Sequence, residues 1–197
     1  ALTANWSDRK VNPKDALHAK MSAKAYDGNV GDKVGNYEIS KIHSDDTGLR
    51  AALFVDGSGN QVLAYAGTDF TSLSDWKANI LQGMGIESAQ YTNAIEVARS
   101  YGAITFTGHS LGGGLASAAA IYTGGTGVVF NAAGLHNNTL GDFNRSRGNI
   151  THYHSGYDAI SAINAFTPTS VPGTQINMGH GGWHLMGDMC SAMRTSC

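Results

Sequence analysis

The sequence predicts an α/β protein with a mostly parallel central sheet, an antiparallel N-terminal part and helices on both faces. Three observations support this class. After Gly67, helical and strand patterns alternate along the chain, as they do in parallel sheets covered by helices. Before it, the link Gly57-Ser-Gly-Asn60 joins two apolar strands as a hairpin. A β-branched strand and an alanine-rich helix flank a glycine-rich turn at residues 108–112.

The N-terminal third of the chain predicts one helix and three strands. Asn12 and Pro13 have the form of a helix N-cap followed by proline at the first helical position. The helix is expected to continue to about residue 26, with Leu17, Met21 and Ala25 facing inward. The strands are rich in β-branched and aromatic residues and are expected at residues 37–43, 49–56 and 61–66.

The remainder of the chain predicts helices and strands in alternation. The helices are expected at residues 87–101 and 110–122, and the strands at residues 103–107, 127–131 and 150–154. In such sheets, functional sites lie at the carboxyl ends of the parallel strands. Ser110 follows the predicted strand at residues 103–107, so the sequence places this serine at such an end.

Length and composition bound the class of protein. A chain of 197 residues with 42% hydrophobic residues is expected to form one domain over residues 1–197. Charged residues make up 14% and the net charge is −2, so no basic face for nucleic acid is expected. The longest apolar stretch, residues 115–122, is too short and too rich in alanine to cross a bilayer, which predicts a soluble protein. The sequence begins at Ala1 without a basic and apolar leader, as expected of a protein whose signal peptide has been removed, or of an excised domain.

The two cysteines, Cys190 and Cys197, both lie near the end of the sequence. A disulfide between them would hold the final turn, and two free thiols are the alternative, so the sequence leaves their state open. Gly, Ser, Thr and Asn are abundant while charged residues are few, a composition that favours a secreted protein.

One serine stands between the predicted strand at residues 103–107 and the helix that follows it. The run Gly108-His-Ser110-Leu-Gly112 has the form of a nucleophile elbow, in which a serine holds unusual backbone angles on a strained turn. The two glycines would leave room for the neighbouring chain, and the serine hydroxyl would stand clear of the sheet. The N–H of Leu111 would lie at a helix N-terminus, where it can stabilise an oxyanion. An inert serine in a glycine-rich turn is the alternative.

A nucleophilic serine needs a histidine to take its proton and a carboxylate to orient that histidine. In α/β-hydrolases the chain order is serine, then carboxylate, then histidine, so the carboxylate is sought after Ser110. Asp158 is preferred because it follows directly on the predicted strand at residues 150–154. Asp142 looks like a helix-start residue, and Asp188 follows the best histidine in sequence, so both are disfavoured.

The histidines that follow Ser110 are candidates for the catalytic base, and their positions in the sequence rank them. His184 is preferred as the base because it opens a helical run, whereas His180 is surrounded by glycines that would hold a base poorly. His152 and His154 lie within the predicted strand at residues 150–154 and precede Asp158, so chain order argues against them. His136 follows a predicted strand closely and is expected to line the rim of the cleft.

The second oxyanion donor is expected on the loop after an early strand. Gly67 and Thr68 follow the predicted strand at residues 61–66. They can place the N–H and the hydroxyl of Thr68 opposite Leu111. An ordinary turn at the end of a strand is the alternative.

With these residues in place, the sequence resembles the lipase class 3 family, and in particular its small bacterial members related to phospholipase A1. The resemblance spans about residues 37–190. The chain departs from the family where Ala66 replaces an arginine, which leaves open how the oxyanion loop is supported here. The matching motifs, in chain order, are Ala66-Gly67-Thr68, Asp75-Trp76 with Asn79, Gly108 to Gly113, Asp158 and His184.

The resemblance implies an α/β-hydrolase fold in which residues 71–85 correspond to the lid. It implies a serine carboxylic ester hydrolase that cleaves acyl esters of lipids, as lipases and phospholipases A1 do, and that needs no cofactor. Its partner would be a lipid or another acyl ester, met in solution or at a membrane or lipid interface. The residues implied are Ser110, Asp158 and His184 for catalysis, and Thr68 and Leu111 for the oxyanion hole.

Other functions stay open at this stage. A cutinase- or feruloyl-type esterase would suit the same catalytic residues, and an exported toxin domain that hydrolyses phospholipids is compatible with the sequence. A non-catalytic binding module that keeps the fold is disfavoured, since all three catalytic residues occur in the expected order. A metal site at His180 and His184 is disfavoured because Gly181 and Gly182 oppose a helix between them.

Overall fold

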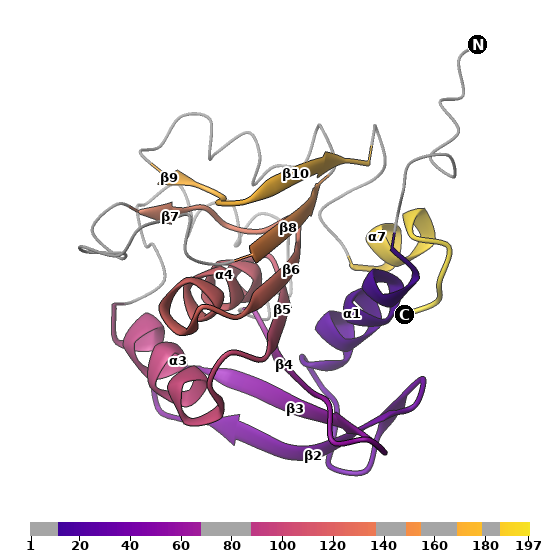
Figure 1. Ribbon diagram of the computed structural model, residues 1–197, viewed down its shortest axis with the longest axis horizontal. Helices are drawn as coiled ribbons and strands as arrows, with labels where there is room; N and C mark the ends of the chain where they lie inside the picture. Colours follow the sequence, from indigo (N-terminus) through magenta and orange to yellow (C-terminus); the bar gives the residue numbers. More distant parts are fainter. Residues whose placement is uncertain (1–11, 68–87, 137–148, 155–168, 179–185) are drawn as a thin grey trace.

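The computed structural model describes residues 12–67, 88–136, 149–154, 169–178 and 186–197. Its main feature is an eight-stranded sheet in the order β1-β2-β3-β4-β5-β6-β8-β10 (Figure 1). Two further strands, β7 (Leu135–His136) and β9 (Thr169–Ser170), form a small antiparallel pair. The strands of the main sheet are β1 (Lys33–Val34), β2 (Tyr37–Ser44), β3 (Arg50–Asp56), β4 (Gln61–Tyr65), β5 (Thr105–His109), β6 (Thr126–Phe130), β8 (Asn149–His154) and β10 (Thr174–Asn177).

The sheet changes from antiparallel to parallel at β4. Strands β1 to β4 pair in antiparallel order, whereas β4, β5, β6, β8 and β10 are parallel neighbours. The predicted hairpin joins β3 to β4, and Asp56 N donates to Asn60 O across it at 3.1 Å. The predicted mostly parallel sheet with an antiparallel N-terminal part is confirmed. Because parallel strands run in one direction, the carboxyl ends of β4, β5, β6 and β8 lie along one edge.

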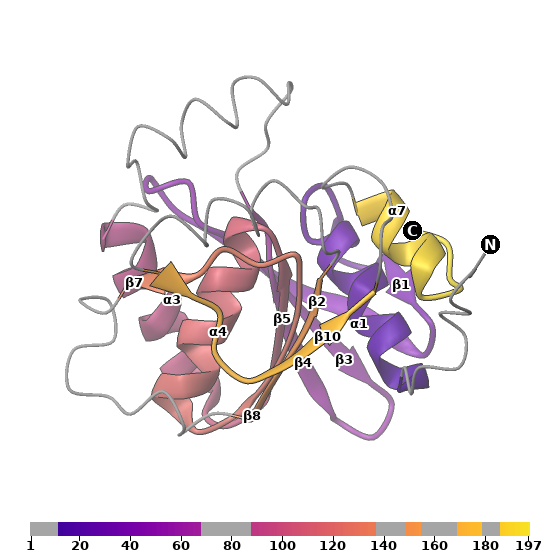
Figure 2. The ribbon, with the colours of Figure 1, turned by 90° about the horizontal axis from the view of Figure 1, so that it is seen from above.

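Helices cover both faces of the sheet, as the sequence predicts. Helices α1 (Pro13–Lys24) and α7 (Met186–Ala192) lie on one face, and α3 (Ser88–Tyr101) and α4 (Leu111–Thr123) on the other (Figures 1 and 2). Helix α1 begins at the predicted residue, because the Asn12 side chain accepts a hydrogen bond from Lys14 N at 3.0 Å. In the described part of the chain, no helix has the length and hydrophobicity needed to span a bilayer.

Helix α4 is buried along nearly its whole length. Its residues from Gly112 to Ile121 are all buried, and their small side chains let the helix lie close to β5 and β6. Gly113 marks one close approach, since a Cβ added there would come 2.6 Å from the Cβ of Ala132. This packing fixes the first turn of α4 at the carboxyl end of β5.

Element boundaries differ from the prediction where tertiary pairing decides them. Strand β5 extends to His109, beyond the predicted end at residue 107, because its ladder with β6 continues to the pair His109↔Phe130. Strand β6 ends at Phe130 because Asn131 has a φ of 42°, outside the extended region. The sequence does not predict β1, β7, β9 and β10, which are two to four residues long and depend on a neighbouring segment for their pairing.

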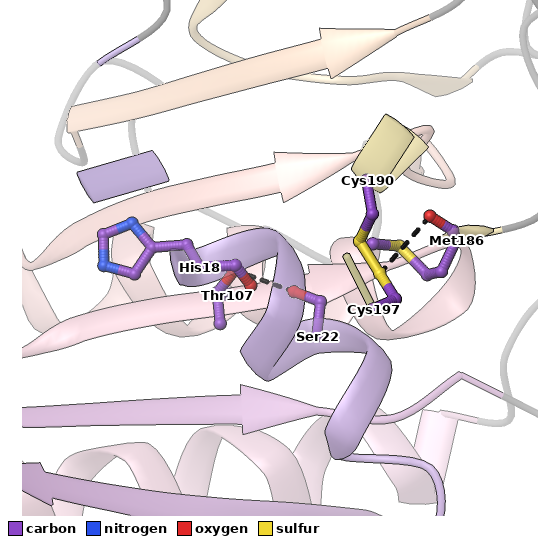
Figure 3. The surroundings of a disulfide bond; sticks show 6 residues. All are labelled: His18, Ser22, Thr107, Met186, Cys190 and Cys197. Carbon is purple, nitrogen blue, oxygen red and sulfur yellow. Dashed lines mark hydrogen bonds between the residues drawn. A yellow bond between two sulfur atoms is a disulfide. The ribbon is translucent and has the colours of Figure 1, made fainter. Parts of the chain in front are cut away.

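The C-terminal segment is held by a disulfide bond between Cys190 and Cys197 (Figure 3). A turn at Arg194, which has a φ of 58°, reverses the chain, and Thr195 N donates to Cys190 O at 2.9 Å. The disulfide therefore ties the C-terminal residue to α7. Helix α7 in turn packs against α1. The buried cluster around this helix is rich in sulfur and comprises Ala19, Val128, Phe130, Tyr153, Met178, Met186, Met189, Cys190 and Met193.

Removing the disulfide is expected to destabilise the protein without abolishing its fold. The closed loop is short, so the expected loss is about 2–3 kcal/mol, or a fall in Tm of roughly 5–10 °C. The measurement is thermal unfolding of a variant that carries both Cys190→Ser and Cys197→Ser. Ser196→Ala, at an exposed neighbouring position, is the control. A double variant with the Tm of the wild type would contradict the prediction.

Candidate active site

Ser110 lies between β5 and α4 and has a backbone conformation that residues other than glycine avoid. Its φ is 59° and its ψ is −124°. Such angles cost about 1–3 kcal/mol and persist only where the surroundings impose them. Here Ser110 N donates to Phe130 O at 3.1 Å. The Ser110 carbonyl accepts from the N–H groups of Gly113, Gly114 and Ala133 at 3.0, 3.3 and 2.9 Å, so three segments hold the strained residue.

Gly108 and Gly112 allow the close contacts of this elbow. A Cβ added to Gly108 would lie 2.2 Å from Gly112 O, and a Cβ added to Gly112 would lie 2.3 Å from Tyr65 O. Both obstacles are backbone atoms, which cannot rotate away as the end of a side chain can. The steric reason that the sequence gives for these glycines therefore holds in the structure.

Gly108→Ala is expected to destabilise the fold by about 2–3 kcal/mol, because the added carbon forces the elbow to move. Gly57→Ala is the matched control, since a Cβ there meets nothing within 4 Å. The midpoints of urea unfolding compare the two variants with the wild type. Equal midpoints for both variants would refute the steric account.

The Ser110 hydroxyl and the Leu111 N–H lie next to one another in this turn. Ser110 is 5% exposed, and its hydroxyl does not cap α4, although serines at this position commonly cap their helix. Leu111 is the first residue of α4. The N–H of a first helical residue has no intrahelical partner and lies at the positive end of the helix dipole. A hydroxyl and a backbone donor suited to an anion therefore meet at the carboxyl end of β5.

Gly67 brings the end of β4 against the same turn. A Cβ added to Gly67 would lie 3.2 Å from His109 O and 3.3 Å from Gly112 N. Gly67 therefore lies beside the elbow. Thr68, the predicted second oxyanion donor, comes directly after Gly67 in sequence and lies outside the described residues.

The predicted partners of Ser110 also lie outside the described residues. Strand β8, which ends at His154, precedes the predicted carboxylate in sequence, and α7, which begins at Met186, follows the predicted base. The predicted residues that the structure does not describe are Thr68, the lid segment 71–85 with Asp75, Trp76 and Asn79, Asp142, Asp158, His180 and His184.

Two buried tyrosines pack beneath the elbow. The Tyr65 hydroxyl donates to Ala94 O at 2.7 Å, and a Cβ added to Gly114 would meet the Tyr91 hydroxyl at 2.8 Å. Burial raises the pKa of both phenols, so they stay neutral at physiological pH. Neither tyrosine therefore places a negative charge near the elbow.

His152 on β8 is buried and has both ring nitrogens engaged. Its Nε2 accepts from Ala132 N at 3.0 Å, and its Nδ1 lies 2.6 Å from Gln175 Oε1. The Gln175 amide nitrogen donates to the carbonyls of Val171 and Gly173, which fixes the orientation of the amide. Since an amide oxygen only accepts, these partners assign the ring proton to Nδ1 and a neutral imidazole. The ring supports the chain at the end of β6, and chain order also argues against this residue as the base.

Sequence reasoning gives no role to the side chains of His109 and Tyr26, which the structure brings together. His109 Nδ1 lies 2.9 Å from the Tyr26 hydroxyl, and the two rings meet edge-on with their centroids 6.1 Å apart. His109 is visible in the serine motif, but Tyr26 is separated from it by 83 residues. Nothing in the local pattern relates the two positions, so this pair is found only in the folded chain.

Comparison with known sequences gives a family and a relative. Residues 18–178 match the family model described as a Tle-like phospholipase domain. An extracellular phospholipase A1 from Serratia liquefaciens is 34% identical in an alignment of 142 residues, and the match covers 65% of this chain. The chain spans 44% of the length of that relative.

Comparison with solved structures gives the fold. A triacylglycerol lipase from Penicillium expansum superposes with a TM-score of 0.63 at 17% identity, covering 92% of this chain and 87% of the lipase. Lipase II from Rhizopus niveus superposes with a TM-score of 0.55 at 15% identity, covering 93% of this chain and 82% of that one. The predicted α/β-hydrolase fold is confirmed by this likeness and by the sheet order.

Proposed function

The chain belongs to the family of Tle-like phospholipase domains, and from this membership we propose that it hydrolyses acyl ester bonds of lipids, with phospholipids as the substrate class. The proposal takes Ser110 as the nucleophile and needs no cofactor. The Serratia relative is named as an extracellular phospholipase A1, which supports this substrate and an exported location for this chain. The disulfide is in keeping with export, since such bonds persist in oxidising compartments.

In the proposed reaction, the Ser110 oxygen attacks the carbonyl carbon of the ester while His184 takes its proton. Asp158 orients His184 and stabilises the imidazolium. The carbonyl oxygen becomes an oxyanion that accepts hydrogen bonds from the N–H groups of Leu111 and Thr68. His184 then gives the proton to the leaving alcohol, and water releases the acyl group from the serine.

One observation carries this proposal: Ser110 is held in a strained conformation while its hydroxyl is left out of the helix cap. Strain of this kind is maintained at functional sites, and a serine with only a structural role gains nothing from it. The neighbouring first turn of α4 offers donors to a developing negative charge. Acyl transfer is a reaction class that uses a hydroxyl and such donors together.

The test is a substrate panel assayed with the wild type and Ser110→Ala in the presence of EDTA. The panel contains p-nitrophenyl esters of increasing acyl length and vesicles of a diacyl phosphatidylcholine. We expect the wild type alone to release fatty acid from phosphatidylcholine. Cleavage of short esters only would replace the proposal with a cutinase- or feruloyl-type esterase. A wild type that is inactive on every substrate and binds the vesicles would favour a non-catalytic module.

A further inference from the structure

The Tyr26 hydroxyl reaches the carboxyl end of β5 from the opposite side of the sheet to α4. Tyr26 follows α1, which packs beside β4, β5 and β6 (Figure 1). Its hydroxyl lies 2.9 Å from His109 Nδ1 and 3.4 Å from His109 O. His109 directly precedes Ser110, so the phenol is bonded to the residue that leads into the elbow.

The same hydroxyl also lies against Gly67. A Cβ added to Gly67 would come 2.9 Å from the Tyr26 oxygen, with His109 O and Gly112 N at 3.2 and 3.3 Å. Gly67 has no side chain, and this allows the phenol, the end of β4 and the elbow to meet. The phenol thus contacts the residue before Thr68 and the residue before Ser110, which are the segments that lead to the two proposed oxyanion donors.

We propose that the Tyr26 hydroxyl is a positioning group for the oxyanion hole. It bonds to the His109 ring and lies against Gly67, and in this way it fixes Gly67, the residue before the proposed donor Thr68, relative to the elbow that carries the Leu111 N–H. Oxyanion donors act only when they lie about 2.7–3.1 Å from the oxyanion. A small shift of one donor therefore weakens stabilisation of the transition state. The inference rests on the proposed ester hydrolysis and adds a residue to its machinery.

A hydrogen bond to the oxyanion is made in the transition state and not to the same degree in the bound substrate. Tyr26→Phe keeps the ring and removes only the hydroxyl. It is therefore expected to lower kcat by about 10- to 100-fold while KM changes little. A merely structural hydroxyl would lower the Tm and leave kcat at temperatures well below it unchanged.

The chain offers a matched control in a second tyrosine and histidine pair. The Tyr101 hydroxyl lies 2.6 Å from His43 Nε2, and these rings also meet edge-on, with centroids 5.6 Å apart. His43 is on β2, which β3 and β4 separate from β5 in the sheet. Tyr101→Phe therefore removes the same kind of hydrogen bond away from the elbow, and we expect it to leave kcat unchanged.

The experiment measures kcat, KM and Tm for a soluble p-nitrophenyl ester, together with the affinity for an alkyl trifluoromethyl ketone. This ketone forms an oxyanion when a serine adds to it, so its affinity reports the oxyanion hole directly. We expect Tyr26→Phe to lose ketone affinity by about the factor that it loses in kcat. His109→Phe should lose a similar factor, and the double variant should lose no more than the worse single variant, because the two groups act as one unit.

The outcomes separate this inference from the proposed function. If the wild type hydrolyses the ester, Ser110→Ala does not, and Tyr26→Phe keeps wild-type kcat and ketone affinity, the positioning role is overturned and the serine mechanism stands. Equal losses in Tyr26→Phe and Tyr101→Phe would also overturn it, since the effect would then be general destabilisation. A wild type with no hydrolysis and no ketone binding would overturn both proposals.

Discussion

Ser110→Ala is expected to lower kcat for ester hydrolysis by about 10⁴- to 10⁶-fold, because the acyl-enzyme can no longer form. The fold should survive, since the bonds that hold this residue are made by its backbone N–H and carbonyl and not by its hydroxyl. Steady-state hydrolysis of a p-nitrophenyl ester measures the loss, and a thermal melt checks the fold.

Ser117→Ala is the matched control for this variant. Ser117 lies in the same helix, is fully buried, and donates its hydroxyl hydrogen to Gly113 O at 2.8 Å. Removing that hydroxyl should lower stability slightly and leave kcat close to the wild-type value. A Ser110→Ala enzyme with wild-type activity would show that another nucleophile performs the reaction.

His184→Ala is expected to lower kcat by about 10³- to 10⁵-fold, because the serine then has no group to take its proton. His180→Ala should retain most of the activity, since this position is not assigned to the proton transfer. Steady-state kinetics of both variants near pH 8 make the comparison.

A pH profile gives an independent check of the same assignment. Wild-type activity should fall as the pH drops through the pKa of the base, since a protonated imidazole cannot accept the serine proton. Residual activity in His184→Ala should lack this dependence. A large loss in His180→Ala with little loss in His184→Ala would assign the base to His180 instead.

The change from antiparallel to parallel pairing could be predicted because its signals are local. The turn residues at Gly57 to Asn60 define a hairpin, and the alternation of helix and strand after Gly67 requires crossovers between parallel strands. Strand β10 could not be predicted in the same way. Its four residues, Thr174–Asn177, are mostly polar and form a strand only beside β8.

The candidate site likewise combines features that neighbouring residues predict with contacts that form only when the chain folds. The strained turn at Ser110 is predictable because its two glycines lie two residues before and two residues after the serine. The atoms that forbid side chains there include Tyr65 O, which only the folded sheet brings close. The contact of Tyr26 with His109 and the two partners of His152 are likewise products of packing.

The roles of Asp158, His184 and Thr68 stay predictions, as does the single domain over residues 1–197. They rest on chain order, on spacing and on the family resemblance. For Leu111, the structure adds its place at the start of α4. The cysteines show the reverse case, in which the sequence leaves two states open and the structure shows a bond, because the turn at Arg194 returns the chain to α7.

Covalent trapping of the nucleophile tests the serine mechanism most directly. The protein is incubated with a fluorophosphonate, and the modified residue is located by mass spectrometry of its peptides while ester hydrolysis is followed. We expect one phosphonyl group on Ser110, formed at the rate at which activity is lost, and no adduct in Ser110→Ala. Complete loss of activity with the adduct on another residue, or full activity with Ser110 modified, would contradict the account.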